Sequence, residues 1–590
     1  MIRNERSSLG GFSNLKETIL RGEKMKNNKK ILLIMFLFGI FIGSLDSGII
    51  SPARTVIANS LAVSQNNSVW MITIYTLVYA VSMPISGKLS DRYGKKKLFT
   101  ISIFIFGLGS LLCGLSNYFG SYPMLLISRA IQALGGGGIM PIATAYIGES
   151  FPKEKRGSAL GLVGGVYGIS NVLGPTVGSA ILGAAGSSHW GILFLVNVPI
   201  VIVVIAISIS IKDSVEIKSS KKMDLSGGTA ASLLILSIMY ALTNLDFHNF
   251  AKSISSTNVY PFLILFIVLL PVFIIIEKKA EDPIINLKYF TNREIALTLM
   301  LAFISGIGLM GIVFIPQFAE NVLKLKTGSG GYLVTLMAVF TGIAAPLGGK
   351  LIDKFSAKFI LVLGFSCTAA GALILALIVV KLSSIFILIA GLALMGLGMG
   401  FTMGTPLNYL IQTNVSEDET ASAQSTLSLI RSIGVAISPN ILINFISDAA
   451  KNLQGNLMAV MPKISMVPNA PAQNLTGKGA SPEALAGIQN ADVTTIVDSL
   501  KKFSASMIDS IAPGIKQSMA GQLPKGVSPD AAVVNMKMDY LKQVDSSKVL
   551  LETTFQNTLN SGFSKLFIAA ALIALIGLVL SIMLKNKKVE

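Results

Sequence analysis

Long apolar runs follow one another along this chain from Ile31 to Leu584, with short polar stretches between most of them. Many of these runs contain 18 or more residues, which is enough for an α-helix to cross a hydrocarbon core about 30 Å thick. An α-helix pairs its own backbone groups, and lipid offers those groups no other partner. The pattern therefore predicts an all-α polytopic membrane protein.

The apolar runs predict fourteen membrane spans, and an even number places both termini on one side of the bilayer. The spans are expected at residues 31–51, 69–89, 97–116, 122–148, 157–184, 190–211, 225–244, 258–277, 294–319, 329–352, 359–380, 384–412, 420–446 and 563–584. Basic residues concentrate in the segments on the side of the termini, for example in "KEKR" at 153–156 and "KNKK" at 585–588. Because short basic loops stay inside, we expect both termini in the cytoplasm.

The composition agrees with a membrane protein and accounts for the strong positive charge. Of the 590 residues, 52% are hydrophobic and 13% are charged, whereas soluble proteins carry about 25% charged residues. The mean hydropathy is +0.68. The formal net charge of +18 follows from the basic loops, so no nucleic-acid partner is expected. Cys113 and Cys367 lie inside apolar runs and form no disulfide or metal-binding pattern; we expect no metal, no cofactor and no enzymatic activity.

One long polar segment, residues 447–562, interrupts the series between the last two predicted spans, on the external side. Two stretches in it, 481–503 and 528–544, open with Ser-Pro and an acidic residue and continue with apolar residues at helical spacing. These features indicate helix starts. We expect a small extracellular helical domain or long helical extensions of spans thirteen and fourteen. A flexible polar loop is the alternative.

The spans and this insert divide the chain into seven parts. They are a cytoplasmic tail (1–30), an N-terminal half of six helices (31–211), two linking helices with a cytoplasmic loop (212–293), the C-terminal half through span thirteen (294–446), the extracellular insert (447–562), span fourteen (563–584) and a cytoplasmic tail (585–590). Residues 1–24 lack apolar periodicity, and "RGEKM" at 21–25 fits a purine-rich gene segment of the kind that binds ribosomes. We therefore expect the native chain to begin at Met25.

A short phrase occurs twice, each time after an apolar run. "GKLSDRYGKKK" begins at Gly87 and "GKLIDKFSAKF" begins at Gly349, so the offset is 349 − 87 = 262 residues. Glycine-rich stretches at 135–141 and 396–406 recur near the same offset. Such repetition indicates two related halves of six helices, as in transporters built from parallel repeats.

Several motifs resemble those of the major facilitator superfamily, and in particular its fourteen-span drug:proton antiporter family. The superfamily signature between spans two and three is matched by Gly87, Leu89, Asp91, Arg92, Gly94, Lys95 and Lys96. "RAIQALGGG" resembles the fourth-span pattern, with Arg129 and Gln132, and "GPTVG" at 174–178 resembles the fifth-span antiporter motif. The chain departs from the family patterns at Gly48, Arg54, Thr55 and Ser170.

The resemblance implies a major-facilitator fold: two six-helix halves plus two linking helices, in a monomer in a bacterial plasma membrane. Such a protein would export amphipathic, cationic, drug-like compounds in exchange for protons by rocking its halves around a central cavity. Its partners would be a small-molecule substrate, protons and the lipid bilayer. Two alternatives stay open: transport of an endogenous lipid, peptide, siderophore or metabolite, and a membrane-anchored interaction protein that uses residues 447–562.

Asp46 is a carboxylic acid inside an apolar span. A charge at that depth costs roughly 2.5–3.5 kcal/mol on insertion scales, so burial favours the neutral acid. Such a group can hold a proton in one state and release it when water or a cation arrives, as an antiporter requires. The alternative is a carboxylate satisfied structurally by Arg54 or a backbone group. Arg129 also lies in a span and is expected to face the bundle interior; by resemblance it supports proton coupling.

The repeated phrase is expected to form a cytoplasmic latch. Asp91 would face a helix N-terminus, where the helix dipole favours negative charge. Gly87 would let two helices approach closely, and Gly94 would allow a turn with positive φ. In the second copy Gly349 and Asp353 recur, but a serine replaces the second glycine, so we expect a weaker latch. The alternative is that the basic residues of the phrase only orient the chain.

The fifth predicted span carries small residues and a proline, the residues that the resemblance assigns to the antiporter motif. They are Gly161, Gly174, Pro175 and Gly178. Small residues allow tight helix contact, and proline kinks a helix. We expect this span to seal the cavity against ion leak, with packing alone as the alternative.

Overall fold

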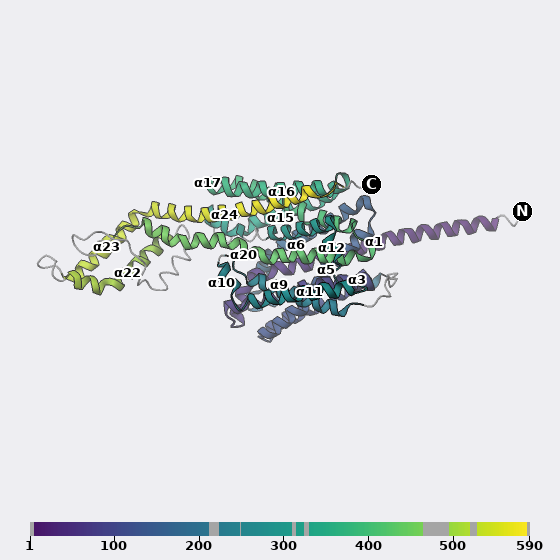
Figure 1. The fold of residues 1–590 in the computed structure, drawn as a ribbon, viewed down its shortest axis with the longest axis horizontal. Coiled ribbons are helices and arrows are strands. Elements are labelled where there is room, and N and C mark those ends of the chain that lie inside the picture. The colour runs from purple at the N-terminus through teal and green to yellow at the C-terminus, as the bar shows by residue number, and fades with distance from the viewer. Residues whose placement is uncertain are drawn as a thin grey trace.

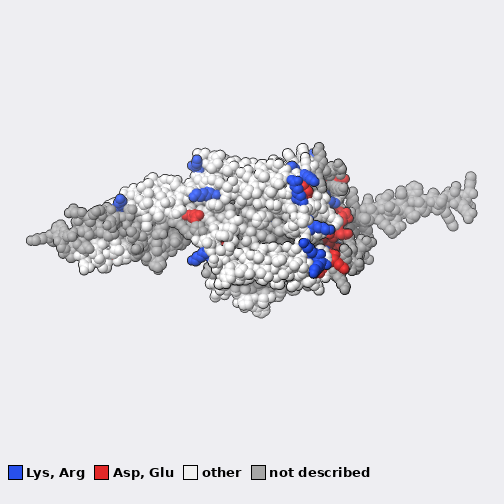
Figure 2. Space-filling model, in the orientation of Figure 1, with Lys and Arg blue, Asp and Glu red and all other residues white. Residues whose placement is uncertain are grey.

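The computed structural model describes residues 5–211, 223–247, 249–309, 314–323, 330–463, 495–519 and 528–586. The regular elements in these ranges are all helices, which confirms the all-α prediction. Twelve of the described helices are long and apolar enough to cross a membrane. On the face shown in Figure 2, charged side chains gather toward the ends of the bundle and the surface between them is almost free of charge.

The N-terminal part of the bundle is followed by two linking helices. The N-terminal part contains α1 (Glu5–Ser60), α2 (Gln65–Ser68), α3 (Trp70–Tyr93), α4 (Lys95–Tyr118), α5 (Tyr122–Ser150), α6 (Lys153–Ala185), η1 (Ser187–His189), α7 (Ile192–Leu195) and α8 (Asn197–Ser210). The linking helices are α9 (Leu225–Asn244) and α11 (Tyr260–Lys279), with α10 (Phe250–Ile254) between them.

The C-terminal part completes the bundle and carries the insert. It contains α12 (Lys288–Thr291), α13 (Arg293–Leu309), α14 (Ile315–Val322), α15 (Gly330–Lys354), α16 (Ala357–Ile374), η3 (Leu375–Val379), α17 (Val380–Leu382), α18 (Ile385–Met403), α19 (Pro406–Thr413), η4 (Glu417–Glu419) and α20 (Thr420–Val460). The insert and the last helix are α22 (Ile496–Met519), α23 (Pro529–Ser546) and α24 (Lys548–Met583).

Three helix pairs make most of the contact between the two parts. Helix α15 packs on α6, and α20 packs on both α3 and α5, while α9 and α11 pack as a pair beside α3. The phrase that begins at Gly87 lies at the end of α3, and the phrase that begins at Gly349 lies at the end of α15. Both copies of the repeated phrase are therefore at the contact between the two parts.

Two of the fourteen predicted spans are not among the twelve candidate helices. The span predicted at 294–319 corresponds to α13, which has 17 residues, and to α14, with residues 310–313 between them outside the described ranges. The span predicted at 420–446 corresponds to α20, which runs along the bundle (Figure 1) but carries many polar residues. Fourteen spans therefore stay a prediction that this architecture accommodates.

The two chain ends lie at one end of the bundle, and the insert projects from the other (Figure 1). Helices α20 and α24 extend beyond the bundle and carry α22 and α23, around a core that includes Leu457, Phe503, Tyr540 and Phe555. The predicted helix at 528–544 is confirmed: Ser528 precedes α23, and its hydroxyl accepts a hydrogen bond from the Ala531 N–H at 3.1 Å. Residues 481–494 of the other predicted helix lie outside the described ranges.

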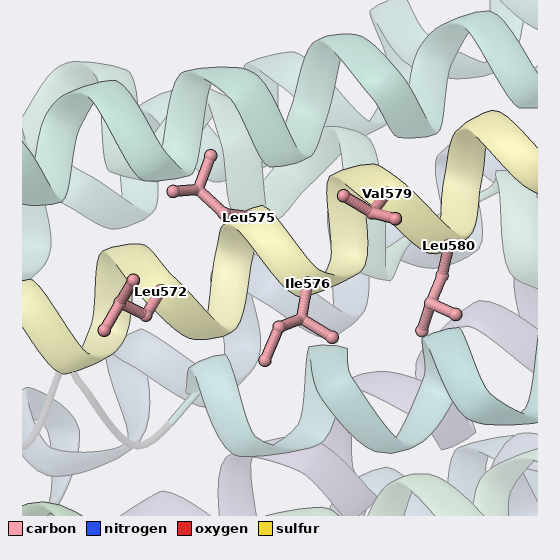
Figure 3. Close-up of a pocket in the computed structure, with 5 residues that line it drawn as sticks. All are labelled: Leu572, Leu575, Ile576, Val579 and Leu580. Carbon is pink, nitrogen blue, oxygen red and sulfur yellow. The ribbon is translucent and has the colours of Figure 1, made fainter.

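The outward face of α24 is apolar within the bundle. Five side chains line a shallow groove of about 450 Å³ there (Figure 3): Leu572, Leu575, Ile576, Val579 and Leu580. Four of them are between 39% and 59% exposed. An apolar face of this kind suits lipid chains, as expected for a helix at the edge of a membrane bundle.

Candidate functional site

A buried charge pair joins α1 to α5. Asp46 is 2% exposed and Arg129 is 1% exposed, and Arg129 Nη1 lies 2.9 Å from Asp46 Oδ2. Gln132, one turn after Arg129, donates from Nε2 to Asp46 Oδ1 at 2.9 Å, and its Oε1 accepts from Arg129 Nη1 at 2.6 Å. Arg54, the partner considered from sequence, donates from Nη1 to Ser68 Oγ at 3.4 Å.

Two further polar residues complete this network, and the sequence analysis did not select them. Asn197 on α8 donates from Nδ2 to Asp46 Oδ1 at 2.9 Å. Ser110 on α4 accepts from Gln132 Nε2 at 2.7 Å. Both lie at a polar position inside an apolar run, which is the signal that singled out Asp46. We call Asp46, Arg129, Gln132, Asn197 and Ser110 the buried polar network.

Aromatic rings cover the guanidinium of Arg129. Its Cζ atom lies 3.9 Å from the ring centre of Tyr75 and 5.6 Å from that of Phe194. Its Nε donates to the Met71 carbonyl at 3.3 Å. Ring faces attract cations most strongly where water is absent, so Arg129 is held by charge, hydrogen bonds and aromatic faces together.

The middle of α6 packs tightly against α1 beside Asp46. A Cβ atom added to Gly174 would lie 2.6 Å from the Cα of Gly48 and 2.9 Å from the Leu45 carbonyl oxygen. Pro175 follows directly and lies inside α6, and Gly178 is buried. Only glycine at both 48 and 174 allows the two backbones to come so close. The departure from the family pattern at position 48 therefore has a packing reason.

Gly161, grouped with the same motif, lies at a different contact. A Cβ atom there would be 3.0 Å from both the Ala345 carbonyl oxygen and the Cα of Pro346. Those two residues belong to α15, on the other part of the bundle. The small residues of α6 thus serve two neighbours: Gly174 faces α1, and Gly161 faces the contact between the parts.

Asp91 lies at the start of a helix from the other part of the bundle. Its Oδ1 accepts from the Ala421 N–H at 3.0 Å, and its Oδ2 accepts from the Ser422 N–H and hydroxyl, each at 2.7 Å. Both donors are in the first turn of α20, where N–H groups have no partner within the helix. The closeness depends on Gly87, where an added Cβ would overlap Ser425 Oγ.

The other residues of the first phrase are fixed around Asp91. Lys95 Nζ lies 3.3 Å from Asp91 Oδ1 and 3.0 Å from Glu149 Oε1. Gly94 has φ +96°, and this left-handed turn separates α3 from α4. The remaining members lie near the same end: Leu89 packs partly buried against the N-terminal core, Arg92 is 3.9 Å from Asp282, and Lys96 donates to the Ile211 carbonyl.

Asp353 makes the reciprocal contact near the start of α6. Its Oδ1 accepts from the Gly157 N–H at 3.0 Å, and its Oδ2 accepts from the Ser158 N–H at 3.0 Å and hydroxyl at 2.6 Å. Gly349 packs against the same segment, because an added Cβ would overlap the Gly157 carbonyl oxygen. Ser356, which replaces the second glycine, caps α16 by accepting from the Phe359 N–H at 3.2 Å. We call the contacts of Asp91 and Asp353 the first and second latch.

No group of three or more His, Cys, Asp or Glu side chains within the described ranges has the arrangement of a metal site. The chemistry that the described site offers is therefore that of a carboxylate, a guanidinium, two amides and hydroxyl groups. These groups can bind charge and hold or move a proton.

Comparison with known proteins places these features in a wider group. A family model described as Major Facilitator Superfamily matches residues 36–439. The MFS-type transporter YfiU of Bacillus subtilis (strain 168) is 40% identical over 427 residues, which cover 72% of this chain and 80% of that protein.

A second relative also matches the insert. The multidrug transporter protein MdtP of Bacillus subtilis (strain 168) is 28% identical over 575 residues, and the match covers 96% of both chains. A match of that length takes in most of residues 447–562. Among solved structures, the human organic anion transporter MFSD10 (TETRAN) superposes with a TM-score of 0.51 at 12% identity, covering 70% of this chain and 93% of that chain. At that identity the likeness concerns the fold alone.

Proposed function

Because this chain belongs to the major facilitator superfamily, we propose that it exports amphipathic organic compounds in exchange for protons by alternating access. The exported compound carries a positive charge, and the membrane is a bacterial plasma membrane with both termini and both latches on the cytoplasmic side. The 28% identity with a multidrug transporter protein over nearly the whole chain supports drug-like substrates.

The observation that carries the proposal is the buried polar network. Asp46 is nearly inaccessible, and its two oxygens accept hydrogen bonds from Arg129, Gln132 and Asn197. A buried carboxylate depends on its donors, and a buried pair becomes unfavourable when one member loses its charge. A proton on Asp46 would therefore free the guanidinium of Arg129 and change the network. A cationic compound that reaches Asp46 would compete with that proton.

The two latches support the alternating-access part of the proposal. Asp91 accepts three hydrogen bonds from α20, and Asp353 accepts three from α6. Both carboxylates reach across the contact between the two parts, and both lie at the end that carries the termini. Opening that end must break the hydrogen bonds of both carboxylates. The state that is closed at that end is therefore stabilised by the aspartates that the two phrases share.

The exchange has an adequate energy source. One elementary charge that crosses the membrane gains about 2.3 kcal/mol per 100 mV. Exchange of one proton for one monocation moves no net charge and is driven by the pH difference alone, whereas a second proton per compound would add this energy. Each release of a proton on the latch side, in the state with both latches open, would leave Asp46 available for the next compound.

A second candidate function is favoured by the insert. It has an apolar core of its own, in which Leu457, Phe503, Tyr540 and Phe555 are at most 2% exposed. Such a packed domain could bind an external partner, with the bundle as its anchor. The two functions differ in one measurement, because an anchor would not move protons in response to small molecules.

The test uses purified full-length protein in proteoliposomes with a pH-sensitive dye inside. Ethidium, an amphipathic cation, should stimulate proton movement through the wild-type protein, and Asp46→Asn should abolish it. Asparagine keeps the shape of the side chain but cannot carry the proton. Because Arg129 loses its counter-charge, the thermal midpoint should fall, but a single size-exclusion peak and a cooperative unfolding transition at the assay temperature or above would show that the variant folds. Undiminished ethidium-driven proton movement in Asp46→Asn contradicts the proposal.

A further inference from the structure

A second deeply placed guanidinium, Arg431 on α20, lacks the partners that surround Arg129. It is 7% exposed, and its Nε and Nη2 atoms are buried without a hydrogen-bond partner. It follows Thr420, the first residue of α20, by 11 residues, which is about 16 Å along the helix axis. That distance is roughly half of a 30 Å hydrocarbon core. Arg431 therefore sits near mid-membrane depth.

The ionisable neighbours of Arg431 carry no negative charge. Within the described residues they are two phenols, Tyr79 on α3 and Tyr167 on α6, and no carboxylate is close enough to interact. Removing one member of a buried ion pair is strongly destabilising, because the other charge is left uncompensated. Arg431 is in that uncompensated position. A bound group with negative charge would supply the missing partner.

The place of Arg431 fits a binding site on the transport path. Its own helix belongs to the C-terminal part, whereas Tyr79 and Tyr167 belong to the N-terminal part. The pairing of α20 with α3 is one of the contacts at which the parts meet. In alternating access the compound is held between the two parts, so a charged side chain at this contact can interact with the bound compound.

A row of aromatic rings connects this charge to the buried polar network. The rings of Tyr75 and Tyr79 are stacked, with centres 5.7 Å apart and planes 18° from parallel. Tyr75 covers the guanidinium of Arg129 at 3.9 Å, and its hydroxyl is buried without a hydrogen-bond partner. The row therefore runs from Asp46 and Arg129 at one end to Arg431 at the other. Flat apolar molecules stack well on such rings.

We propose that Arg431 binds an acidic group of the transported compound, with Tyr79 and Tyr167 beside it. The compound is an amphipathic zwitterion: its acidic group pairs with Arg431, its apolar body lies along Tyr75 and Tyr79, and its basic group points toward Asp46. The acidic group is assigned by the unpaired guanidinium. The basic group rests on the proposed function, because exchange requires competition with the proton.

The sign of the electrostatic coupling explains why the acidic group alone is not enough. An anion at Arg431 would by itself attract a proton to Asp46, so compound and proton would bind together. Exchange requires the reverse, in which each displaces the other. A positive group directed at Asp46 supplies that displacement, since like charges oppose each other at short range. A compound with only the acidic group should bind without driving exchange.

Four probes with one aromatic body separate these contributions. They are 2-naphthylacetic acid, 2-naphthylacetamide, 2-(2-naphthyl)ethylamine and the zwitterion 3-(2-naphthyl)alanine. Binding to the full-length protein in nanodiscs is measured by isothermal titration calorimetry at pH 7.5. Hydrogen bonds to charged groups contribute about 1.5–3 kcal/mol each, which corresponds to roughly 10- to 150-fold in affinity. Arg431→Met should weaken the acid and the zwitterion by this factor and leave the amide and the amine within about twofold.

Two further variants sharpen the binding test. Arg431→Lys keeps the charge and should retain part of the affinity for the acid. Lys381→Met removes an exposed positive charge from α17 and should change no affinity, so it controls for the net charge of the protein. Equal affinity of the wild-type protein for acid and amide, or unchanged affinity of Arg431→Met for the acid, overturns the proposal.

A stability measurement distinguishes binding from a structural role. If Arg431 serves a ligand, the ligand-free protein gains by losing an uncompensated charge, so Arg431→Met should raise its thermal midpoint while binding of the acid is lost. If Arg431 instead held the bundle together, the same variant would lower the midpoint, and the proposal would be wrong.

The proposed function and this inference can fail separately. Proton movement in proteoliposomes should be driven by naphthylalanine and not by naphthylacetic acid, and Asp46→Asn should abolish it. Suppose that Asp46→Asn abolishes ethidium-driven exchange but Arg431→Met leaves the affinity for the acid unchanged. That result would support the proposed function and overturn this inference. Acid binding that needs Arg431, with no proton movement for any probe, would sustain the acidic-group assignment and overturn the proposed exchange.

Discussion

The two parts of the bundle close on each other with the same device but handle buried charge differently. Asp91 and Asp353 each reach across to a helix of the opposite part and accept three hydrogen bonds there. Deeper in the membrane the symmetry ends: Arg129 in the N-terminal part is paired with Asp46, whereas Arg431 in the C-terminal part has two buried nitrogens without partners.

This difference teaches which features of a duplicated transporter are tied to symmetry. Closing one end requires both parts to meet there, so both copies of the phrase retain the carboxylate and the close glycine. The proposed exchange of a proton and a compound requires different groups at different places, so the deep charges need not match. The first latch also differs from the second by an ion pair, since Lys95 lies between Asp91 and Glu149.

The largest expected effect comes from removing the latch carboxylates, and it should be unequal. Asp91 is 7% exposed and belongs to an ion pair, and breaking a buried pair costs about 3–5 kcal/mol. Asp353 is partly exposed and accepts the same number of hydrogen bonds, but it has no ion pair within the described residues, so its removal should cost less. Asp91→Ala should therefore lower the ratio of closed to open protein by more than about 100-fold, and Asp353→Ala by less.

Distance measurement by electron paramagnetic resonance checks this order. Spin labels at Tyr93 and Asp418, both exposed near the latches, report the separation of α3 and α20 in nanodiscs. Binding of compounds should be retained in both variants, because neither residue touches the buried polar network. Equal shifts for the two variants would mean that the Lys95 ion pair does not strengthen the first latch.

A smaller effect, similar for the two latches, is expected for the glycines of the two phrases. In Gly349→Ala the new Cβ would overlap the Gly157 carbonyl oxygen and lie 3.0 Å from the same carbonyl carbon, so backbone is in the way. In Gly87→Ala it would overlap the hydroxyl of Ser425 and lie 2.7 Å from the Ala421 carbonyl oxygen, so backbone is in the way there too. Overpacking costs about 1–3 kcal/mol, and this range applies to both variants.

The matched control for the glycines is Gly183→Ala in α6, where no atom lies within 4 Å of the new Cβ. The same label pair should then report wild-type distances. Thermal midpoints complete the comparison, because a steric block of closure shifts the label distances without unfolding the bundle. If Gly349→Ala closed as well as Gly183→Ala does, the second phrase would not be a closing element.

Much of this architecture was predictable because membrane burial leaves a clear pattern in the sequence. The apolar runs predicted the helices, and Asp46 and Arg129 stood out because charged residues are rare at that depth. Their mutual contact was not predicted, since 83 residues separate them and the register between two helices is set by packing. The proposed roles of these residues stay predictions.

Other features were missed because their signals are weak without the fold. Asn197 and Ser110 are ordinary uncharged residues, and nothing local shows that their helices turn them toward Asp46. Ser356 was read as a lost glycine, but it caps α16 instead. Arg431 is a charge in a predicted span, yet the absence of a nearby carboxylate among the described residues can be seen only when α3, α6 and α20 are brought together.

The smallest expected effect concerns a feature that only the C-terminal part has, the insert. Tyr540 donates its hydroxyl to the Pro462 carbonyl at 2.9 Å and is 2% exposed, and burial raises its pKa to about 12. Tyr540→Phe removes one hydrogen bond and should destabilise the insert by about 0.5–1.5 kcal/mol. Hydrogen exchange of α22 and α23 measures this at pH 7.

The raised pKa of Tyr540 means that the neutral phenol is favoured in the folded insert. The extra stability of the wild-type insert over Tyr540→Phe should therefore shrink as pH rises from about 10 to 12. Subtilisin cleavage of the insert at pH 8 and pH 11 can follow this change. Compound-driven proton movement should equal that of the wild type, because the insert lies outside the bundle. If transport were lost in step with the opening of the insert, the insert would be part of the transport cycle. The difference between the two parts would then matter for transport outside the bundle as well as within it.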